Sequence, residues 1–246
     1  MKADPRVPLL LEAKGSGDRQ ETSVAPKRPL ARYRAFEWVR NAIVAGEIGG
    51  GEYIEESTVC EAVGVSRTPV REAFNQLAAE KYITLTPRHG AQVRTVSAQE
   101  LQEVYEVRRL IEGRCVEILC RSRVPVTETA RIALEERLRA AAAAAESPAD
   151  PELRVEASRA DWTFHYSIVS AAGNSVLTET YEFLRSRQQR VSIATGVKFP
   201  ELVKLFDEHH VAMLEAWRAC DEDEFKRILG EHLRPADRIL ASLEAG

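Results

Sequence analysis

The sequence lacks any apolar run that approaches the ~20 residues needed to cross a bilayer. Its N-terminal apolar stretch, VPLLL, contains a proline and is shorter than the ~7–15 residues of a signal-peptide core. The four cysteines, Cys60, Cys115, Cys120 and Cys220, form no CxxC pair, which excludes a zinc ribbon and favours reduced, buried thiols. These absences predict a cytoplasmic protein without a membrane partner.

Strand patterns and histidines are equally scarce. Alternating apolar residues occur in one short hairpin only, so a Rossmann sheet and a TIM barrel are excluded. The chain has five histidines and no HExxH helix, the motif typical of zinc proteases. Hydrophobic residues make up 44% and charged residues 29%, which is an ordinary globular composition and excludes wholesale disorder. The predicted fold class is mainly α.

The net charge of −4 argues at first against a nucleic-acid partner. The charge is unevenly distributed, however. Residues 1–96 carry 14 lysines and arginines against 12 acidic residues, whereas residues 97–246 carry 20 against 26. A mildly basic first part followed by an acidic second part predicts two domains with different partners.

The first part is organised as a tail followed by short elements. Residues 1–28 mix proline, glycine and charge without periodicity and are expected to be disordered. Helices are predicted over 30–44, 55–63 and 66–80, with a tight turn at Gly64 and an N-cap at Ser66. The stretch YITLTPRHGAQVRTV then predicts a two-stranded hairpin. Three helices and a hairpin predict a winged helix-turn-helix domain over residues 29–96.

The second part, residues 97–246, is expected to be an all-helical bundle. Ser97 and Glu100 form a capping box at its start. Helix breaks are predicted at Pro125 and within 147–151, 172–174 and 196–200, which leaves about six helices.

The stretch GVSRTPVREAFNQL, residues 64–77, carries the strongest functional signal. Arg67 and Arg71 lie four residues apart near a helix N-terminus, where free N–H groups attract phosphate. An arginine on that face is able to bind guanine O6 and N7 with two hydrogen bonds. The stretch closely resembles the recognition helix of GntR-family transcription regulators, with Phe74 in place of the usual leucine.

This resemblance implies that the third helix reads the major groove and that the hairpin approaches the minor groove. The residues that it assigns to DNA binding are Ser57, Ser66, Arg67, Thr68, Arg71, Asn75, Arg88, His89 and Gly90. The implied partner is double-stranded operator DNA.

A second constellation lies in the helical part. Asp161 and His165 are four residues apart and therefore project from one helix face, as a pair of metal ligands would. His210 and His232 are able to meet them if two helices form an antiparallel hairpin around residues 219–223. Three imidazoles and one carboxylate suit Zn²⁺, with Ni²⁺ or a similar ion as the alternative.

The patterns DxxFH and HxxxLxAxxxxD…HL resemble the FCD domain, the helical effector domain of FadR-type GntR regulators. The resemblance implies that Asp161, His165, His210 and His232 hold one divalent cation. The spacing favours His210 over its neighbour His209, which remains the alternative ligand. A small organic acid is the expected effector, with Arg108, Glu112, Asn174 and Arg190 as its candidate binding residues.

The function that these observations predict is a homodimeric, ligand-responsive transcriptional regulator, a repressor that binds an inverted repeat. It is not expected to be an enzyme. Two alternatives remain open. One is a regulator whose effector domain uses no metal, and the other is a metal-dependent hydrolase with Glu208 as the nearest candidate base.

Overall fold

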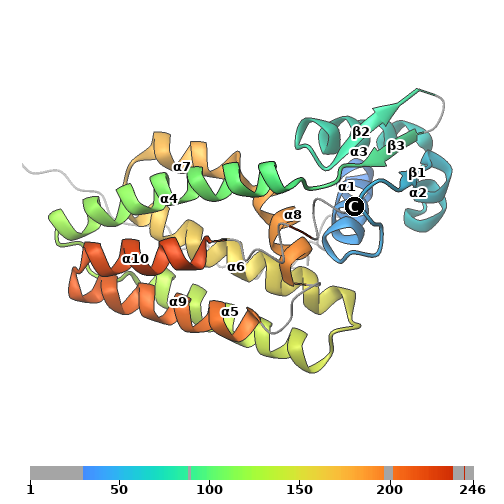
Figure 1. Ribbon diagram of the computed structural model, residues 1–246. Helices are drawn as coiled ribbons and strands as arrows, with labels where there is room; N and C mark the ends of the chain where they lie inside the picture. The colour runs from blue at the N-terminus through green and yellow to red at the C-terminus, as the bar shows by residue number, and fades with distance from the viewer. Residues whose placement is uncertain (1–29, 88–89, 197–201, 235–240, 242–246) are drawn as a thin grey trace, which may run out of the picture.

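A computed structural model describes residues 30–87, 90–196, 202–234 and 241. The tail expected to be disordered, residues 1–28, lies outside these ranges. The first helices of the chain and a small sheet lie at one end of the molecule, and a bundle of longer helices lies at the other (Figure 1). The long helix α4 leaves the sheet and runs along the bundle, so it links the two parts.

The first part contains α1 (Ala31–Val44), α2 (Glu56–Val63) and α3 (Arg67–Ala79). Helix α2 ends at Gly64, whose φ of 67° is left-handed and allows the tight turn into α3 without side-chain strain. Ser66 occupies the predicted N-cap position of α3, but its side chain makes no capping hydrogen bond. The apolar faces of the three helices meet in one core that includes Phe36, Val70 and Leu77.

A three-stranded antiparallel sheet packs against these helices. Its order is β1 (Tyr53–Ile54), β3 (Gly90–Val93) and β2 (Ile83–Thr86). The hairpin of β2 and β3 confirms the sequence-based expectation. The two-residue strand β1 was not predicted, because so short a segment has no readable alternation.

The helical part contains seven described helices. They are α4 (Ala98–Arg121), α5 (Glu128–Glu146), α6 (Pro151–Ala171), α7 (Ser175–Glu182), α8 (Arg185–Gly196), α9 (Leu202–Ala219) and α10 (Glu222–His232). Six were expected, because residues 175–196 contain no helix-breaking residue before Gly196. The chain nevertheless turns at Phe183 and Leu184, which separates α7 from α8.

Two features hold this part together. Its main core contains large, fully buried side chains such as Phe164, Trp217 and Phe225, and each contributes about 1.5–3 kcal/mol through burial. The helix N-termini are capped as well. The side chains of Ser97, Thr127, Asp150, Asn174 and Asp221 each accept a hydrogen bond from a backbone N–H in the first turn.

The two parts contact each other through α1, α6 and α8. The Tyr82 hydroxyl, at the start of the wing, donates a buried 2.8 Å hydrogen bond to the Gln189 side chain of α8. The Arg154 guanidinium of α6 donates to the carbonyl oxygen of Ala45 at 2.7 Å. The bundle therefore touches the helix-and-sheet part through specific polar contacts as well as through the chain connection.

The four cysteines are free thiols, but only Cys115 is buried; Cys60 and Cys120 are partly buried, and Cys220 is exposed, so the predicted burial is wrong for Cys220. Among the described residues, no helix combines the length and the apolar character that a membrane crossing requires.

Candidate functional site

A groove of about 650 Å³ lies between α2, α3 and the hairpin. Five residues predicted to bind DNA line it together: Ser57, Arg67, Arg71, Asn75 and Gly90. Ser66 and Thr68 are exposed at the start of α3. Arg88 and His89 lie outside the described residues. The N-terminus of α3 opens toward solvent here, so its backbone N–H groups and both arginines are available to a phosphate backbone.

Two acidic side chains line the same groove. The Arg71 Nε donates to both carboxylate oxygens of Glu56, at 2.8 and 3.0 Å. The Ser57 hydroxyl donates to the carboxylate of Glu55 at 3.1 Å. The sequence analysis did not single out either glutamate, because each reads as an ordinary first-turn acid of α2.

The helical part holds a cluster of three buried histidines. His165 comes from α6, His210 from α9 and His232 from α10, and their potential ligand atoms lie within 4.8 Å of one another. The Nε2 atoms of His165 and His210 are 3.1 Å apart. His209 is only partly buried, whereas His210 is fully enclosed, so the structure brings His210 and not its neighbour into the cluster.

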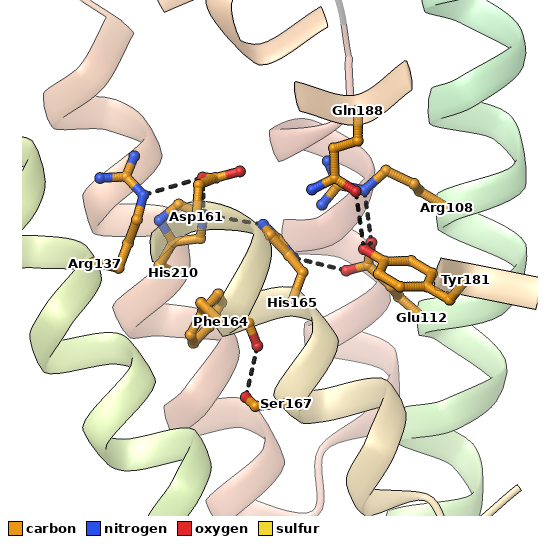
Figure 2. A network of polar contacts seen from close by, with 10 residues as sticks. All are labelled: Arg108, Glu112, Arg137, Asp161, Phe164, His165, Ser167, Tyr181, Gln188 and His210. Carbon is orange, nitrogen blue, oxygen red and sulfur yellow. Dashed lines mark hydrogen bonds and ion pairs between the residues drawn. The ribbon is translucent and has the colours of Figure 1, made fainter. Parts of the chain in front are cut away.

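Asp161 lies beside the cluster, as Figure 2 shows. Its Oδ1 is 3.4 Å from the Nε2 of His210 and accepts a 3.0 Å hydrogen bond from Arg137 of α5. Burial by itself would raise the pKa of Asp161, but the positive charge of Arg137, with smaller effects from the neighbouring histidines and Arg108, lowers that pKa to about 2. The aspartate is therefore an anion next to the three imidazoles.

Two of the imidazoles, those of His210 and His232, have the protonation state that a metal ligand needs. Burial lowers the pKa of His210 well below its usual value, and the nearby His232 lowers it further. Burial also lowers the pKa of His232. The Nδ1 atoms of both residues are buried without a hydrogen-bond partner. Two neutral rings and the His165 ring beside an anionic carboxylate form a donor set that fits a divalent cation.

Glu112 fixes the orientation of His165. The His165 Nδ1 donates to Glu112 at 2.8 Å, which leaves the lone pair on Nε2 directed at the cluster. A carboxylate in this position is typical of metal-bound histidines, because it selects the tautomer and orients the ring. The sequence analysis assigned Glu112 to the effector, and the structure places it between His165 and Arg108.

A buried polar network surrounds Glu112 (Figure 2). Its other oxygen accepts hydrogen bonds from the Arg108 Nε at 2.8 Å and from the Tyr181 hydroxyl at 2.7 Å. Burial would raise the pKa of Glu112, but Arg108 and His165 lower it below the usual range. The Tyr181 hydroxyl also lies 3.4 Å from the side-chain oxygen of Gln188. The Nη2 of Arg108 and the Nε2 of Gln188 are buried without a partner and are donors that this network leaves unused.

The structure gives two other predicted effector residues different partners. Asn174 is exposed and caps α7 by accepting a hydrogen bond from the backbone N–H of Leu177. Arg190 is buried and donates to Glu100, at the start of α4, at 2.6 Å. The structure thus brings Arg108 and Glu112 to the histidine cluster, and holds Asn174 and Arg190 in contacts of their own.

The DNA-facing groove and the histidine cluster lie in regions that match two known protein families. The family described as bacterial regulatory proteins, gntR family, matches residues 32–93, and the FCD domain matches residues 103–235. The chain belongs to the GntR family. It is a transcriptional regulator with a DNA-binding N-terminal part and a C-terminal FCD domain, as the sequence motifs indicated.

Individual relatives agree with this placement. The Nta operon transcriptional regulator of Aminobacter aminovorans is 30% identical to this GntR-family chain over 173 residues, which are 70% of this chain and 77% of that protein. The transcriptional repressor GlaR of Escherichia coli is 24% identical, over 86% of this chain and 96% of its own length.

Solved structures share the fold. A GntR regulator from Rhodococcus sp. RHA1 matches with a TM-score of 0.67 and 21% identity, over 87% of this chain and 98% of that one. McbR/YncC of Escherichia coli matches with a TM-score of 0.65 and 21% identity, over 87% of this chain and 97% of its own.

Five residues of the two sites were not predicted from the sequence: Glu55, Glu56, Arg137, Tyr181 and Gln188. The last four contact partners at least seven residues away, so no local spacing marks them. Arg137 lies in an alanine-rich helix, where it reads as a solvated charge. It is instead 6% exposed, and burial of an arginine at that level requires an acidic partner.

Proposed function

We propose that this protein is a homodimeric, ligand-responsive repressor that reads an inverted-repeat operator through α3 and the wing. The observation that carries the proposal is the groove in which Arg67 and Arg71 stand at a helix N-terminus. A two-fold dimer presents two such helices, so the bound DNA has matching half-sites about one helical turn apart. Two relatives are named as repressors, GlaR of Escherichia coli and the gluconate operon repressor of Bacillus subtilis, and these names support repression rather than activation.

Binding to selected DNA tests this proposal. Duplexes enriched from a random library with the wild-type protein serve as the probe, in fluorescence anisotropy at fixed salt. Arg71→Ala should weaken binding to the enriched duplex by about 1–3 kcal/mol per half-site, the value of one bidentate arginine–guanine contact. The control is Arg131→Ala, because Arg131 lies on the bundle and pairs with Glu128 and Glu135. Equal affinity of both variants would refute the assignment.

We further propose that Asp161, His165, His210 and His232 hold one divalent cation, with zinc preferred and nickel as the alternative. The support is the donor set, which combines three buried imidazoles and an ionised carboxylate. A bound cation would supply positive charge and open coordination positions. The chain itself orients His165 through Glu112 and holds Asp161 through Arg137.

The effector in this proposal is a small carboxylate. The support is the unused Nη2 of Arg108, buried beside Glu112, because a guanidinium N–H is a strong donor for a carboxylate oxygen. An effector changes DNA affinity only if it prefers one arrangement of the two DNA-binding parts over the other. Tyr181 and Gln188 connect the Arg108–Glu112 pair to α8, which contacts the DNA-binding part through Gln189.

A thermal-shift panel tests the effector. Small carboxylates, hydroxy acids and sugar acids are added to metal-loaded and to chelator-treated protein. A ligand at 100 times its Kd adds about 2.7 kcal/mol to stability. An acid that stabilises only the metal-loaded protein supports the proposal. An acid that stabilises both forms equally would favour an effector domain that works without metal.

A further inference from the structure

The recognition groove contains acidic side chains where DNA would bind. Its described lining includes Arg67 and Arg71 and also Glu55 and Glu56. A carboxylate at a DNA-binding surface repels every phosphate, whatever the base sequence. These glutamates therefore weaken general attraction to DNA, and a gain in another property is needed to explain their position.

The contact between Glu56 and Arg71 has a specific geometry. Arg71 uses Nε alone, which is 2.8 and 3.0 Å from the two carboxylate oxygens of Glu56. The two terminal nitrogens of Arg71 stay outside this ion pair. Exposure is also unequal, since 64% of the Arg71 side chain is accessible but only 26% of the Glu56 side chain. Glu56 thus holds the inner end of the guanidinium, and the terminal nitrogens belong to a largely exposed side chain that lines the groove.

The start of α2, which carries Glu56, is itself fixed against the wing. Gly90 has a φ of 79°, and a Cβ at this position would lie 2.3 Å from the carbonyl oxygen of Ile54 and 3.2 Å from the Cα of Glu55. The backbone of β3 therefore packs directly on the residues before α2. Ile54 also pairs with Ala91 in the sheet. A carboxylate on so well-supported a helix end is a rigid anchor for a long, flexible arginine.

We propose that Glu56 is a specificity-determining residue that positions Arg71 for base reading. It binds the Nε, so the two terminal nitrogens are presented end-on to the O6 and N7 atoms of a guanine. Holding the arginine in place before binding reduces the conformational entropy that recognition costs. The negative charge meanwhile disfavours all DNA equally and leaves the preference unchanged, so any gain in preference comes from the positioning of Arg71.

This inference rests on the proposed reading of DNA by Arg71. The same ion pair has an opposite role if Glu56 keeps Arg71 away from DNA. The two roles predict opposite changes in affinity for the selected sequence when Glu56 loses its charge. If Glu56 positions Arg71, loss of its charge weakens binding to the selected sequence. If Glu56 sequesters Arg71, loss of its charge strengthens that binding.

The experiment uses the full-length protein with Glu56→Gln and a matched control, Glu61→Gln. Glu61 lies on the same helix, is exposed and is not among the residues that line the groove. Both variants remove one negative charge. Affinities are measured for a duplex enriched by the wild-type protein and for a scrambled duplex of equal length, at the same salt concentration.

We expect Glu56→Gln, but not Glu61→Gln, to lose preference for the enriched duplex over the scrambled duplex. Glu56→Gln should bind the enriched duplex roughly tenfold more weakly, the lower end of the range for a bidentate base contact. It should bind the scrambled duplex no more weakly than Glu61→Gln does. Enrichment repeated with Glu56→Gln should also give a relaxed preference at the guanine that Arg71 contacts. Glu56→Asp, which keeps the charge, should retain part of the preference.

Three results would overturn the inference. Tighter binding of Glu56→Gln than of Glu61→Gln to the enriched duplex would show that the ion pair sequesters Arg71. Equal changes in the two variants would show that only charge matters. Full preference retained in Arg71→Ala would refute the reading of DNA by Arg71, and the role of Glu56 with it. After either of the first two results, the proposed DNA binding through Arg71 still stands if Arg71→Ala loses the preference for the enriched duplex.

Discussion

His165 shows how one residue is shaped by partners on other helices. Its Nδ1 donates to Glu112 of α4 and its Nε2 faces His210 of α9. The position of Asp161 and His165 on one helix face could be predicted from their four-residue spacing, and so could the Arg108–Glu112 ion pair. The contact between Glu112 and His165 could not, because it joins residues 53 positions apart and depends on how α4 packs against α6.

Adjacent histidines offer a direct test of the cluster at the residue scale. His210→Ala should remove most of the bound metal, because His210 lies within the cluster. His209→Ala is the matched control and should keep the metal, since its side chain is only partly buried at the cluster's edge. Metal content is measured by mass spectrometry. The protein is purified without a chelator and without a metal-affinity column. Equal metal loss in both variants would contradict the proposed ligand set.

Glu112→Gln tests the buried charge pair. The substitution leaves Arg108 buried without its anionic partner, which typically costs about 3–5 kcal/mol of folding free energy. The free energy of unfolding is measured by urea denaturation of the metal-free protein. Glu128→Gln, which removes an exposed surface pair with Arg131, should change the unfolding free energy little. A similar small change in Glu112→Gln would mean that the network tolerates loss of its charge.

At the scale of elements, the most informative difference from expectation is the break between α7 and α8. The sequence there has no glycine or proline before Gly196, so one helix was predicted over 175–196. Tertiary packing overrides this local preference. Tyr181 and Leu184 are buried on either side of an exposed Phe183, and the turn allows α8 to cross toward α1 and α6. Such a bend has no local signal and could not be read from the sequence.

The contact of α8 with the wing can be measured. Tyr82→Phe removes the hydroxyl that donates to Gln189 and leaves a buried amide oxygen unpaired, which costs about 1–3 kcal/mol. We expect a corresponding fall in the free energy of unfolding. Tyr33→Phe, at an exposed position of α1, is the control and should have little effect. Equal stability of both variants would show that the hydrogen bond does not fasten the two parts.

At the scale of the whole molecule, the gntR family matches residues 32–93 and the FCD domain matches residues 103–235. The charge division does not follow these domains closely, because residues 30–96 carry eight lysines and arginines against eight acidic residues, and the basic excess lies in residues 1–29. The sequence motifs indicated both families. They did not predict the contacts between the parts, because Tyr82, Arg154 and Gln189 carry no motif.

The histidine cluster joins α6, α9 and α10, and through Glu112 also α4, so a bound cation should stabilise the bundle as a whole. Chelation of the wild-type protein should therefore lower its Tm, and added Zn²⁺ should restore it, by an amount that grows with metal concentration. His232→Ala should respond to neither treatment. A wild-type Tm that is insensitive to both would argue against a bound cation.

The mixed charge of the recognition groove has a further consequence for how the protein is distributed on a chromosome. Genomic DNA offers on the order of 10⁶ or more competing sites, and each holds a regulator mainly through its phosphates. Because Glu55 and Glu56 oppose Arg67 and Arg71 in the groove, these irrelevant sites retain each molecule more weakly. Each molecule then leaves an irrelevant site sooner, which shortens its search for an operator, whereas the occupancy of that operator depends on the sequence preference of Arg71.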